Sequence, residues 1–196
     1  MSAPVEIVSA AQLERIMYHP SVARSVTRRL VQRFVGPINE TLVRYQIVTP
    51  ARIAAFLAQV GHESGRLQYV REIWGPTPAQ RGYEGRADLG NTEPGDGRRF
   101  MGRGLIQITG RANYQRMSDA LGFDFIGQPE ALESSHYAAL SAGEFWRSRN
   151  LNALADAGDF DRITARVNGG QNGRADRRAI FTVAGIVLLE AGRNLA

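Results

Sequence analysis

The sequence predicts a mainly α-helical protein whose helices lie on both sides of a glycine-rich, loop-like middle. Amphipathic helical patterns fill residues 9–65 and resume at about residue 112, whereas residues 75–110 carry many glycines and scattered charges. The chain has 196 residues and is 43% hydrophobic, which is enough to enclose one core or two lobes around a cleft. We therefore expect a single domain over residues 1–196.

Three short helices are expected in the first fifty residues. An S-x-x-Q capping box at residues 9–12 opens the first, and Pro20-Ser21 separates it from the second. The apolar positions of the second helix are Val22, Val26, Leu30 and Phe34. Gly36-Pro37 is expected to end that helix and to start a third one, which continues through Val48.

A fourth helix is expected from residue 50 to about Gly65. Thr49 is the predicted N-cap, Pro50 takes the first helical position, and apolar residues follow at helical spacing from Ile53 to Val60. After the glycine-rich middle, helices are expected from residue 112, with breaks at 122–129 and 150–158. The last helix should run from residue 174 to about 191. Its apolar stretch is too short to span a bilayer, which favours a buried core helix over membrane attack.

Residues 105–109 are the best strand candidate in the glycine-rich middle. On a short strand, alternate side chains share a face, so one side can present hydrogen-bonding groups to a ligand. That face would carry Arg103, Leu105, Gln107 and Thr109.

Composition narrows the possible function. The chain has no cysteine, which excludes disulfides, thiolate zinc sites and cysteine nucleophiles and suits a reducing cytoplasm. Its net charge is +5, its pI is about 10.2 and every basic residue is arginine, which suits nucleic acid or an anionic cell wall equally. Residues 1–12 lack the pattern of a secretion signal, so we expect synthesis in a bacterial cytoplasm without export by a signal peptide.

Glu63 is the first candidate for chemistry. It continues the apolar stripe of Ile53, Phe56 and Val60 and lies in the last helical turn. Burial and the negative end of the helix dipole both disfavour a carboxylate there, so its pKa is expected to be raised, as a general acid requires. The structural alternative is an ion pair with Arg66 or Arg71.

Other site types fit the sequence poorly. His62-Glu63 begins like the zinc motif H-E-x-x-H, but residue 66 is arginine rather than histidine. The segment 102–114 lacks the lysine and the spacing of a phosphate-binding loop, and its interleaved aliphatic residues argue against an arginine-glycine nucleic-acid segment. His19 and His136 are isolated in sequence and are expected to be structural.

The chain resembles glycoside hydrolase family 19, the chitinase and phage-endolysin family with a lysozyme-like fold. The matching pieces are His62-Glu63-Ser64-Gly65, Gly90-Asn91, Gly95-Asp96-Gly97, Phe100, Gly102-Arg103-Gly104, Ile106-Gln107-Ile108-Thr109-Gly110, Asn113-Tyr114, Phe145-Trp146, Ile163-Thr164-Ala165-Arg166-Val167-Asn168-Gly169-Gly170, Arg174 and Asp176-Arg177. They occur in the family's order between residues 50 and 177. The resemblance implies a mainly α, two-lobed helical domain with a small, short-stranded β and loop region lining a cleft.

The resemblance also implies an inverting hydrolase with two carboxyl groups. One protonates the leaving oxygen and the other activates water across a gap of roughly 6.5–9.5 Å. Glu63 matches the acid, and Glu72 resembles the second carboxylate of short phage-type members. Ile73-Trp74 replaces the polar stretch that follows that glutamate in phage enzymes. Glu84, where plant-type chitinases carry their base, is the rival.

The remaining site residues follow from the same resemblance. Thr109 matches a residue that helps to hold the attacking water. Gln107, Asn113 and Asn168 match amide side chains of the family's cleft, and Arg103 is expected to bind substrate beside them. Arg174 and Arg177 match a basic pair expected to orient the carboxylates. For Trp74 and Tyr83 the sequence allows two roles, stacking on a sugar ring or packing in the core.

Three functions remain open at this point. The first is a peptidoglycan hydrolase of the endolysin, muramidase type, acting on the wall after release, as a monomer and without a cofactor or nucleic acid. It would not insert stably in a membrane, and a separate membrane-permeabilising protein can give it access. The second is a chitinase, and the third is a non-catalytic basic module that binds cell wall or nucleic acid.

Overall fold

The computed structural model describes residues 5–193, and within this range the regular structure is helical. The elements in chain order are α1 (Ala10–Met17), α2 (Arg24–Arg44), α3 (Pro50–Glu63), α4 (Pro78–Arg81), the 3-10 helix η1 (Ala87–Leu89), α5 (Asp96–Arg99), α6 (Arg111–Leu121), η2 (Pro129–Glu133), α7 (Ser135–Ser148), α8 (Leu151–Asp156), α9 (Phe160–Asn168) and α10 (Arg174–Arg193). The predicted helical class is therefore confirmed.

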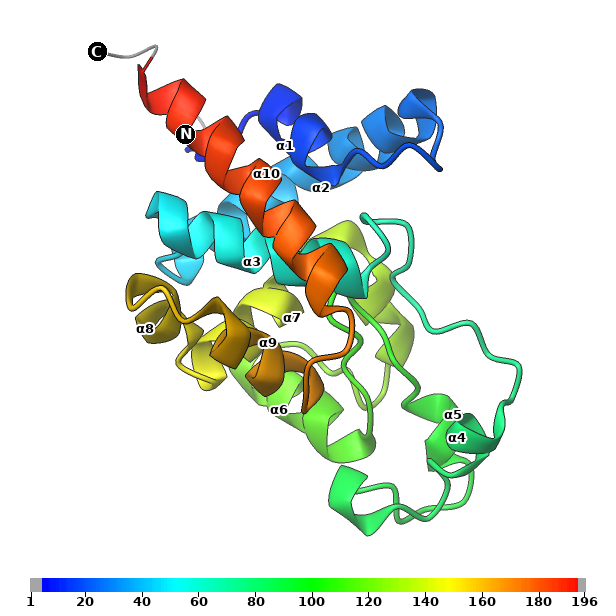
Figure 1. The fold of residues 1–196 in the computed structure, drawn as a ribbon. Helices are drawn as coiled ribbons and strands as arrows, with labels where there is room; N and C mark the ends of the chain where they lie inside the picture. The colour runs from blue at the N-terminus through cyan, green and yellow to red at the C-terminus, as the bar shows by residue number, and fades with distance from the viewer. Residues whose placement is uncertain (1–4, 194–196) are drawn as a thin grey trace.

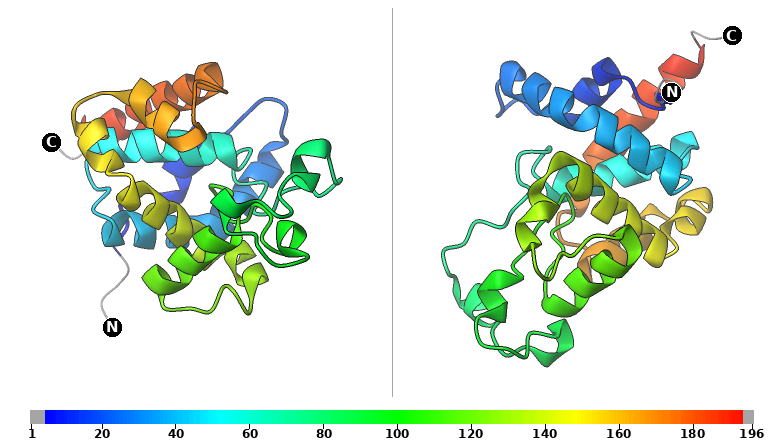
Figure 2. Two further views of the ribbon diagram at one scale, coloured as in Figure 1. Left: turned by 90° about the horizontal axis from the view of Figure 1, so that it is seen from below. Right: turned by 180° about the vertical axis from the view of Figure 1, so that it is seen from behind.

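Two lobes are visible in the ribbon. The helices α1, α2, α3 and α10 gather at one end of the molecule, and α4 and α5 lie on long connections at the other (Figure 1). The views from below and behind show the same separation, with α6 and α7 between the two ends (Figure 2). The chain between α3 and α6 thus forms a loop-rich lobe beside a helical one.

Helix α3 lies at the centre of the helical lobe. Thr49 caps it as predicted, accepting a hydrogen bond from the Arg52 amide at 3.3 Å, and the helix ends at Glu63. The run from Ile53 to Gly61 is buried on every side, because α10 packs along α3 and α8 and α9 also contact it. A helix enclosed in this way fixes the position of its last residue firmly.

The first fifty residues form two helices rather than the three expected. The Ser9–Gln12 capping box is present, but α2 runs from Arg24 to Arg44 straight through Pro37. Proline removes one backbone donor and strains the preceding turn. Burial of Phe34, Ile38 and Leu42 on the face that packs against α7 offsets that cost, so the helix continues.

The predicted strand at residues 105–109 is not formed. Within residues 5–193, strand-like pairing is limited to isolated bridges of Arg103 with Arg71 and with Ile108. Gly104 has φ +79°, and the chain turns back so that the Arg103 and Ile108 amides exchange hydrogen bonds of 3.1 and 2.7 Å. A closed turn replaces the extended segment, and the shared side-chain face is lost.

The later helices follow the predicted pattern with one addition. Residues 151–156, expected to lie in a break, form α8, whose Leu151 and Ala155 are buried. The last helix packs on α3 and α1 and buries Ile180, Ala184 and Val187. Val183, Ile186 and Leu189 remain exposed, so the expected core helix buries only one face. Among the described residues, no helix is both long and apolar enough to cross a membrane.

Candidate functional site

Glu63 is held by a buried arginine. It is the last residue of α3, its side chain is 21% exposed, and its Oε1 accepts a hydrogen bond from Arg177 of α10. The partner of Glu63 is therefore neither Arg66 nor Arg71, the two named in the structural alternative, but Arg177. Within the described residues, no donor contacts Oε2, so that oxygen is the one left to meet a ligand.

Arg177 is almost completely enclosed, with a side chain that is 2% exposed. Its guanidinium donates to Gln59 Oε1 at 2.5 Å and to the Asn172 carbonyl at 3.2 Å as well as to Glu63. Gln59 in turn donates to Thr164 at 3.0 Å. Helices α3, α9 and α10 thus share one polar network, and its charge orients Glu63, as expected for Arg177.

A second pair of ion contacts lies directly beside the first. His62 Nδ1 is 2.7 Å from Asp176 Oδ2, and Arg66 donates to Asp176 Oδ1 at 2.6 Å. Burial disfavours the Asp176 carboxylate, but the His62 hydrogen bond and the Arg66 charge hold its pKa below its ordinary value. Within residues 5–193 no group of His, Cys, Asp and Glu is arranged to hold a metal ion.

Glu72 is fixed in the segment that follows α3. Its amide donates to the Gly102 carbonyl at 2.8 Å, and the Gly102 amide donates back to Glu72 Oε2 at 3.1 Å. Its other oxygen, Oε1, accepts from Gln80 at 2.9 Å and from Tyr83 at 3.3 Å. Together these three donors hold the Glu72 carboxyl group in one orientation.

Trp74 and Tyr83 lie near each other beside Glu72. Their ring centroids are 6.3 Å apart, and Trp74 lines a hollow of about 550 Å³ together with Glu72, Arg98 and Met101. Burial and the neighbouring Glu72 charge raise the pKa of Tyr83, so its hydroxyl remains a donor to Glu72. We refer to this space as the Glu72 hollow.

Glu84, the rival second carboxylate, has a structural contact for each oxygen. It accepts hydrogen bonds from the Gly95 amide at 2.6 Å and from the Gly97 amide at 2.9 Å. Both donors lie at the start of α5, where a carboxylate also meets the positive end of the helix. Glu84 therefore closes the loop before α5.

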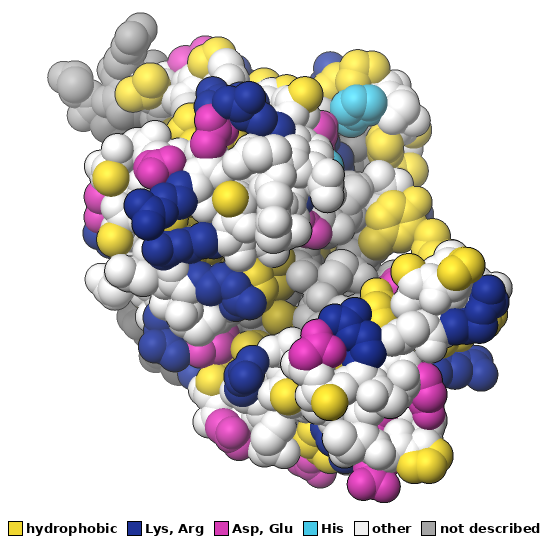
Figure 3. Space-filling model, turned by 60° about the horizontal axis from the view of Figure 1, so that its bottom comes forward, with side chains coloured by type: hydrophobic (Ala, Val, Ile, Leu, Met, Phe, Trp, Pro, Cys, Tyr) yellow, Lys and Arg dark blue, Asp and Glu magenta, His cyan; other side chains and the backbone are white. Residues whose placement is uncertain are grey.

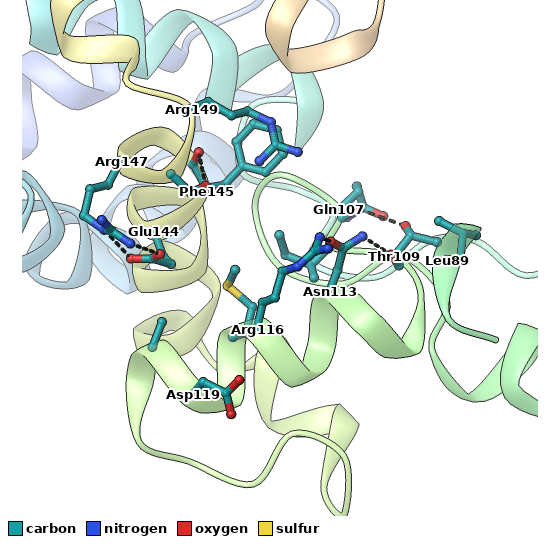
Figure 4. Close-up of a pocket in the computed structure, with 14 residues that line it drawn as sticks. Leu89, Gln107, Thr109, Asn113, Arg116, Asp119, Glu144, Phe145, Arg147 and Arg149 are labelled. Carbon is teal, nitrogen blue, oxygen red and sulfur yellow. Dashed lines mark hydrogen bonds and ion pairs between the residues drawn. The ribbon is translucent and has the colours of Figure 1, made fainter. Parts of the chain in front are cut away.

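A larger hollow of about 870 Å³ lies on the other side of Gly102, and we call it the Gln107 hollow. Gln107, Thr109 and Asn113 line one side of it (Figure 4). Thr109 Oγ1 donates to the Gln107 carbonyl at 3.0 Å, and Asn113 Nδ2 donates to the Thr109 carbonyl at 2.7 Å. The structure thus brings these three predicted site residues together.

Gly102 lies between the two hollows. A β-carbon built there would meet Gln107 Oε1 at 2.8 Å and Glu72 Oε2 at 3.3 Å. The polar ends of Gln107 and Glu72 therefore converge on a residue that has no side chain.

Two predicted substrate ligands have other partners. Arg103 is 4% exposed and donates to Glu133 at 2.8 Å and to the Tyr114 hydroxyl at 2.9 Å, so it is a buried structural cation rather than a ligand for sugar. Asn168 donates to the Asn172 carbonyl at 2.7 Å and accepts from the Gly170 amide at 2.8 Å. Asn168 thus holds the loop that supplies an acceptor to Arg177.

Arg174 also differs from its expected role. It forms an ion pair with Asp161 at 2.7 Å and contacts neither Glu63 nor Glu72. The two isolated histidines have local partners, since His19 contacts Ser21 at 2.7 Å and His136 contacts Glu40 at 3.1 Å. These contacts fit the structural role predicted for both.

Sequence reasoning missed Gln59 and Gln80. Each is buried, and each positions a group of the site: Gln59 contacts Arg177, and Gln80 contacts Glu72. Gln59 was detectable as the one polar residue in the apolar run from Ile53 to Val60. Gln80 gave no comparable signal, because the capping box that it forms with Thr77 is enough to account for a glutamine at this position.

One face of the molecule is rich in arginine. The space-filling view shows arginine side chains gathered around a depression on the lower side of the molecule (Figure 3).

No family model matches the chain. A Haemophilus influenzae protein described as a glycosyl hydrolase family 19 domain-containing protein is 31% identical over 172 residues, which cover 74% of this chain and 84% of that protein. Two endochitinases of Arabidopsis thaliana are 30% and 32% identical over 71% and 76% of the chain, which spans 47% and 57% of their lengths.

Solved structures show the same fold. Chitinase C of Streptomyces griseus superimposes with a TM-score of 0.69 at 22% identity, covering 96% of this chain and 95% of that one. A class IV family 19 chitinase of Zea mays has a TM-score of 0.62 at 22% identity, covering 93% and 92%. The expected lysozyme-like arrangement is thereby confirmed. The identity to the Haemophilus protein across most of its length shows that the chain belongs to glycoside hydrolase family 19 and is a glycoside hydrolase.

Proposed function

We propose that the chain cleaves β-1,4 glycosidic bonds of bacterial peptidoglycan by an inverting mechanism. Glu63 Oε2 delivers a proton to the departing glycosidic oxygen. Glu72 removes a proton from a water molecule, which attacks the anomeric carbon from the opposite face of the sugar. The C–O bond breaks as the new one forms, so the product has the inverted configuration.

The observation that carries this proposal is the different environment of the two glutamates. Glu63 has one oxygen on the buried Arg177 and the other free of protein donors, whereas Glu72 receives three hydrogen bonds. The oxygen of Glu63 that receives no donor among the described residues is available to meet the departing glycosidic oxygen, and the hydrogen bonds to Glu72 hold its carboxyl group in one orientation.

The attacking water and the sugar amides have candidate partners in the Gln107 hollow. Thr109 carries a hydroxyl that can both donate and accept, and we propose that it holds the water near Glu72. The side chains of Gln107 and Asn113 can pair with N-acetyl groups, which present one donor and one acceptor each. These roles need no metal or organic cofactor, because two carboxyl groups and water suffice for the reaction.

Chitin is the second candidate substrate. The Arabidopsis relatives and the Streptomyces and Zea structures are described as chitinases or endochitinases. The arginine-based net charge of +5 favours an anionic wall polymer over neutral chitin. We further propose that the enzyme acts as a monomer on the wall after its release from a host bacterium, with access aided by a separate membrane-permeabilising protein.

A comparison of substrates tests the proposal. Permeabilised Gram-negative cells should clear with the purified protein and remain turbid with E63Q. Mass spectrometry of the products should show reducing N-acetylmuramic acid ends released from peptidoglycan. Release of sugars from colloidal chitin without any peptidoglycan product would instead establish the chitinase. Oligonucleotide or wall binding that persists in E63Q, with no glycan cut by the unchanged enzyme, would support the non-catalytic module.

A further inference from the structure

The Gln107 hollow contains two arginines that its predicted site residues do not explain. Arg116 extends from α6 and donates to Asn113 Oδ1 at 2.8 Å. Arg149, at the end of α7, places its guanidinium carbon 3.5 Å from the centroid of the Phe145 ring. Figure 4 shows both guanidinium groups reaching into the same space from different helices.

Neither arginine has an acidic partner among the described residues. The hollow contains two carboxylates, and Glu144 is already paired with Arg147 through contacts of 2.6 and 2.9 Å. The other, Asp119, accepts from Gln115 at 2.8 Å and lies further along α6 than the Arg116 guanidinium (Figure 4). Two positive charges therefore face the hollow without a counter-charge from the protein.

The two charges also act on each other. Desolvation, followed by the charge of Arg116, lowers the pKa of Arg149 from its ordinary value, although arginine stays protonated at any physiological pH. Like charges that share a space repel, and an anion between them relieves that repulsion. The contact with Phe145 holds the Arg149 guanidinium plane in place, so less rotamer freedom is lost when it binds a ligand.

We propose that Arg116 and Arg149 form a carboxylate-binding subsite for acidic substituents on the glycan strand. The subsite lies in the same hollow as Gln107, Thr109 and Asn113, so it would engage a substituent while the sugar amides are bound. Guanidinium groups pair with carboxylates through parallel hydrogen bonds. The inference rests on the proposed function, because peptidoglycan strands carry carboxylates on their muramic acid substituents and chitin carries none.

The carboxylate can come from two positions on peptidoglycan. Intact strands carry carboxylates on their stem peptides, whereas strands treated with an amidase expose the lactyl carboxylate of muramic acid itself. Chitohexaose provides a neutral strand of the same backbone. Binding to the three ligands thus distinguishes the two sources and gives a reference without an anionic group.

Binding should be measured by calorimetry with E63Q, so that no ligand is cut during the titration. Adding R116Q and R149Q together should weaken binding of carboxylate-bearing strands by roughly 10- to 100-fold, the range expected for loss of charge-assisted hydrogen bonds. Chitohexaose affinity should change less than threefold, roughly the scale of a neutral surface change. The matched control is R29Q, which removes an exposed charge of α2 that has no ion pair within the described residues.

Several outcomes would overturn the subsite. One is that R116Q and R149Q together weaken binding of chitohexaose as much as binding of the acidic strands. Another is that R29Q weakens binding of the acidic strands as much as the double substitution does. A third is the absence of any preference of the E63Q protein for acidic strands over chitohexaose. Turnover by the unchanged enzyme is measured separately. Failure to cut peptidoglycan there removes the proposed function, whereas loss of carboxylate preference in the titration removes only the subsite.

Discussion

Glu63 at the end of α3 and Arg177 near the start of α10 form an ion pair in which the arginine is buried and the glutamate is partly exposed. The two residues are 114 positions apart in sequence. A buried guanidinium is costly unless its donors are satisfied, and here Glu63, Gln59 and the Asn172 carbonyl satisfy them. Glu63, the candidate acid, is thus also the counter-charge of the buried Arg177.

The first prediction separates the chemical and structural roles of Glu63. E63Q keeps an acceptor for Arg177 but has no proton to give, so hydrolysis should fall by roughly 10²–10⁴-fold with little change in thermal unfolding. E63A leaves Arg177 without its counter-charge and should lower the free energy of unfolding by about 1–3 kcal/mol. Turnover assays and thermal denaturation measure the two effects. Activity near the unchanged level in E63Q would remove Glu63 from the mechanism.

The second prediction distinguishes the two candidates for the base. E72Q should reduce hydrolysis by roughly 10²-fold or more, because a neutral amide cannot accept the proton from water. E84Q is the matched control, since Glu84 holds the Gly95 and Gly97 amides. It should lower stability by about 1 kcal/mol and keep most of the activity. The opposite pattern in the same turnover assay would assign the base to Glu84.

The third prediction concerns Gly102. In G102A the new methyl group meets Gln107 Oε1 and Glu72 Oε2, so both side chains must move. We expect activity to fall by roughly tenfold or more, because small displacements of reacting groups are costly, while the melting temperature shifts little. The matched control is G36A in α2, where a β-carbon meets nothing within 4 Å. A fully active G102A would show that Gln107 and Glu72 need not converge.

The fourth prediction concerns acid stability. The hydrogen bond from Arg111 outweighs burial and holds the pKa of the buried Asp96 below its ordinary value of 3.8. A depressed pKa in the folded state stabilises the protein above pH 3.8, and this contribution is lost as the pH falls through the folded value. D96N should therefore be less stable at neutral pH and should lose less stability on acidification.

Denaturant unfolding of D96N at several pH values measures this effect. D88N is the matched control, because Asp88 also pairs with an arginine, Arg86, but is largely exposed. Its unfolding curve should follow the unchanged protein at each pH. Parallel pH dependence of D96N and the unchanged protein would contradict the assignment.

The sequence predicted those elements whose signals are local. The cap at Thr49, the proline at position 50 and the apolar spacing after it specify α3 within a few residues, and the structure agrees. The same kind of rule failed at Pro37, because the energy that keeps α2 continuous comes from packing against α7, which lies about a hundred residues later. Local propensity is a weak guide wherever tertiary burial is large.

The candidate site shows the same limit. Family resemblance placed Gln107, Thr109 and Asn113 together, and the structure puts them in one hollow. The resemblance could not show that the Arg103 side chain donates to Glu133 and Tyr114, because those partners come from separate segments of the chain. Arg116 and Arg149 could not be recognised from the sequence for a related reason. Whether an arginine has an acidic neighbour depends on how the chain folds, and among the described residues these two have none.

Two consecutive residues of α3, His62 and Glu63, meet two consecutive residues of α10, Asp176 and Arg177. If α10 slid or rotated by a single residue, both contacts would break together and the buried guanidinium of Arg177 would lose its counter-charge. Helix α10 can therefore pack against α3 in only one register. Glu63, the proposed proton donor, can reach its observed position only after that distant part of the chain has docked, so we expect activity to appear only when folding is complete.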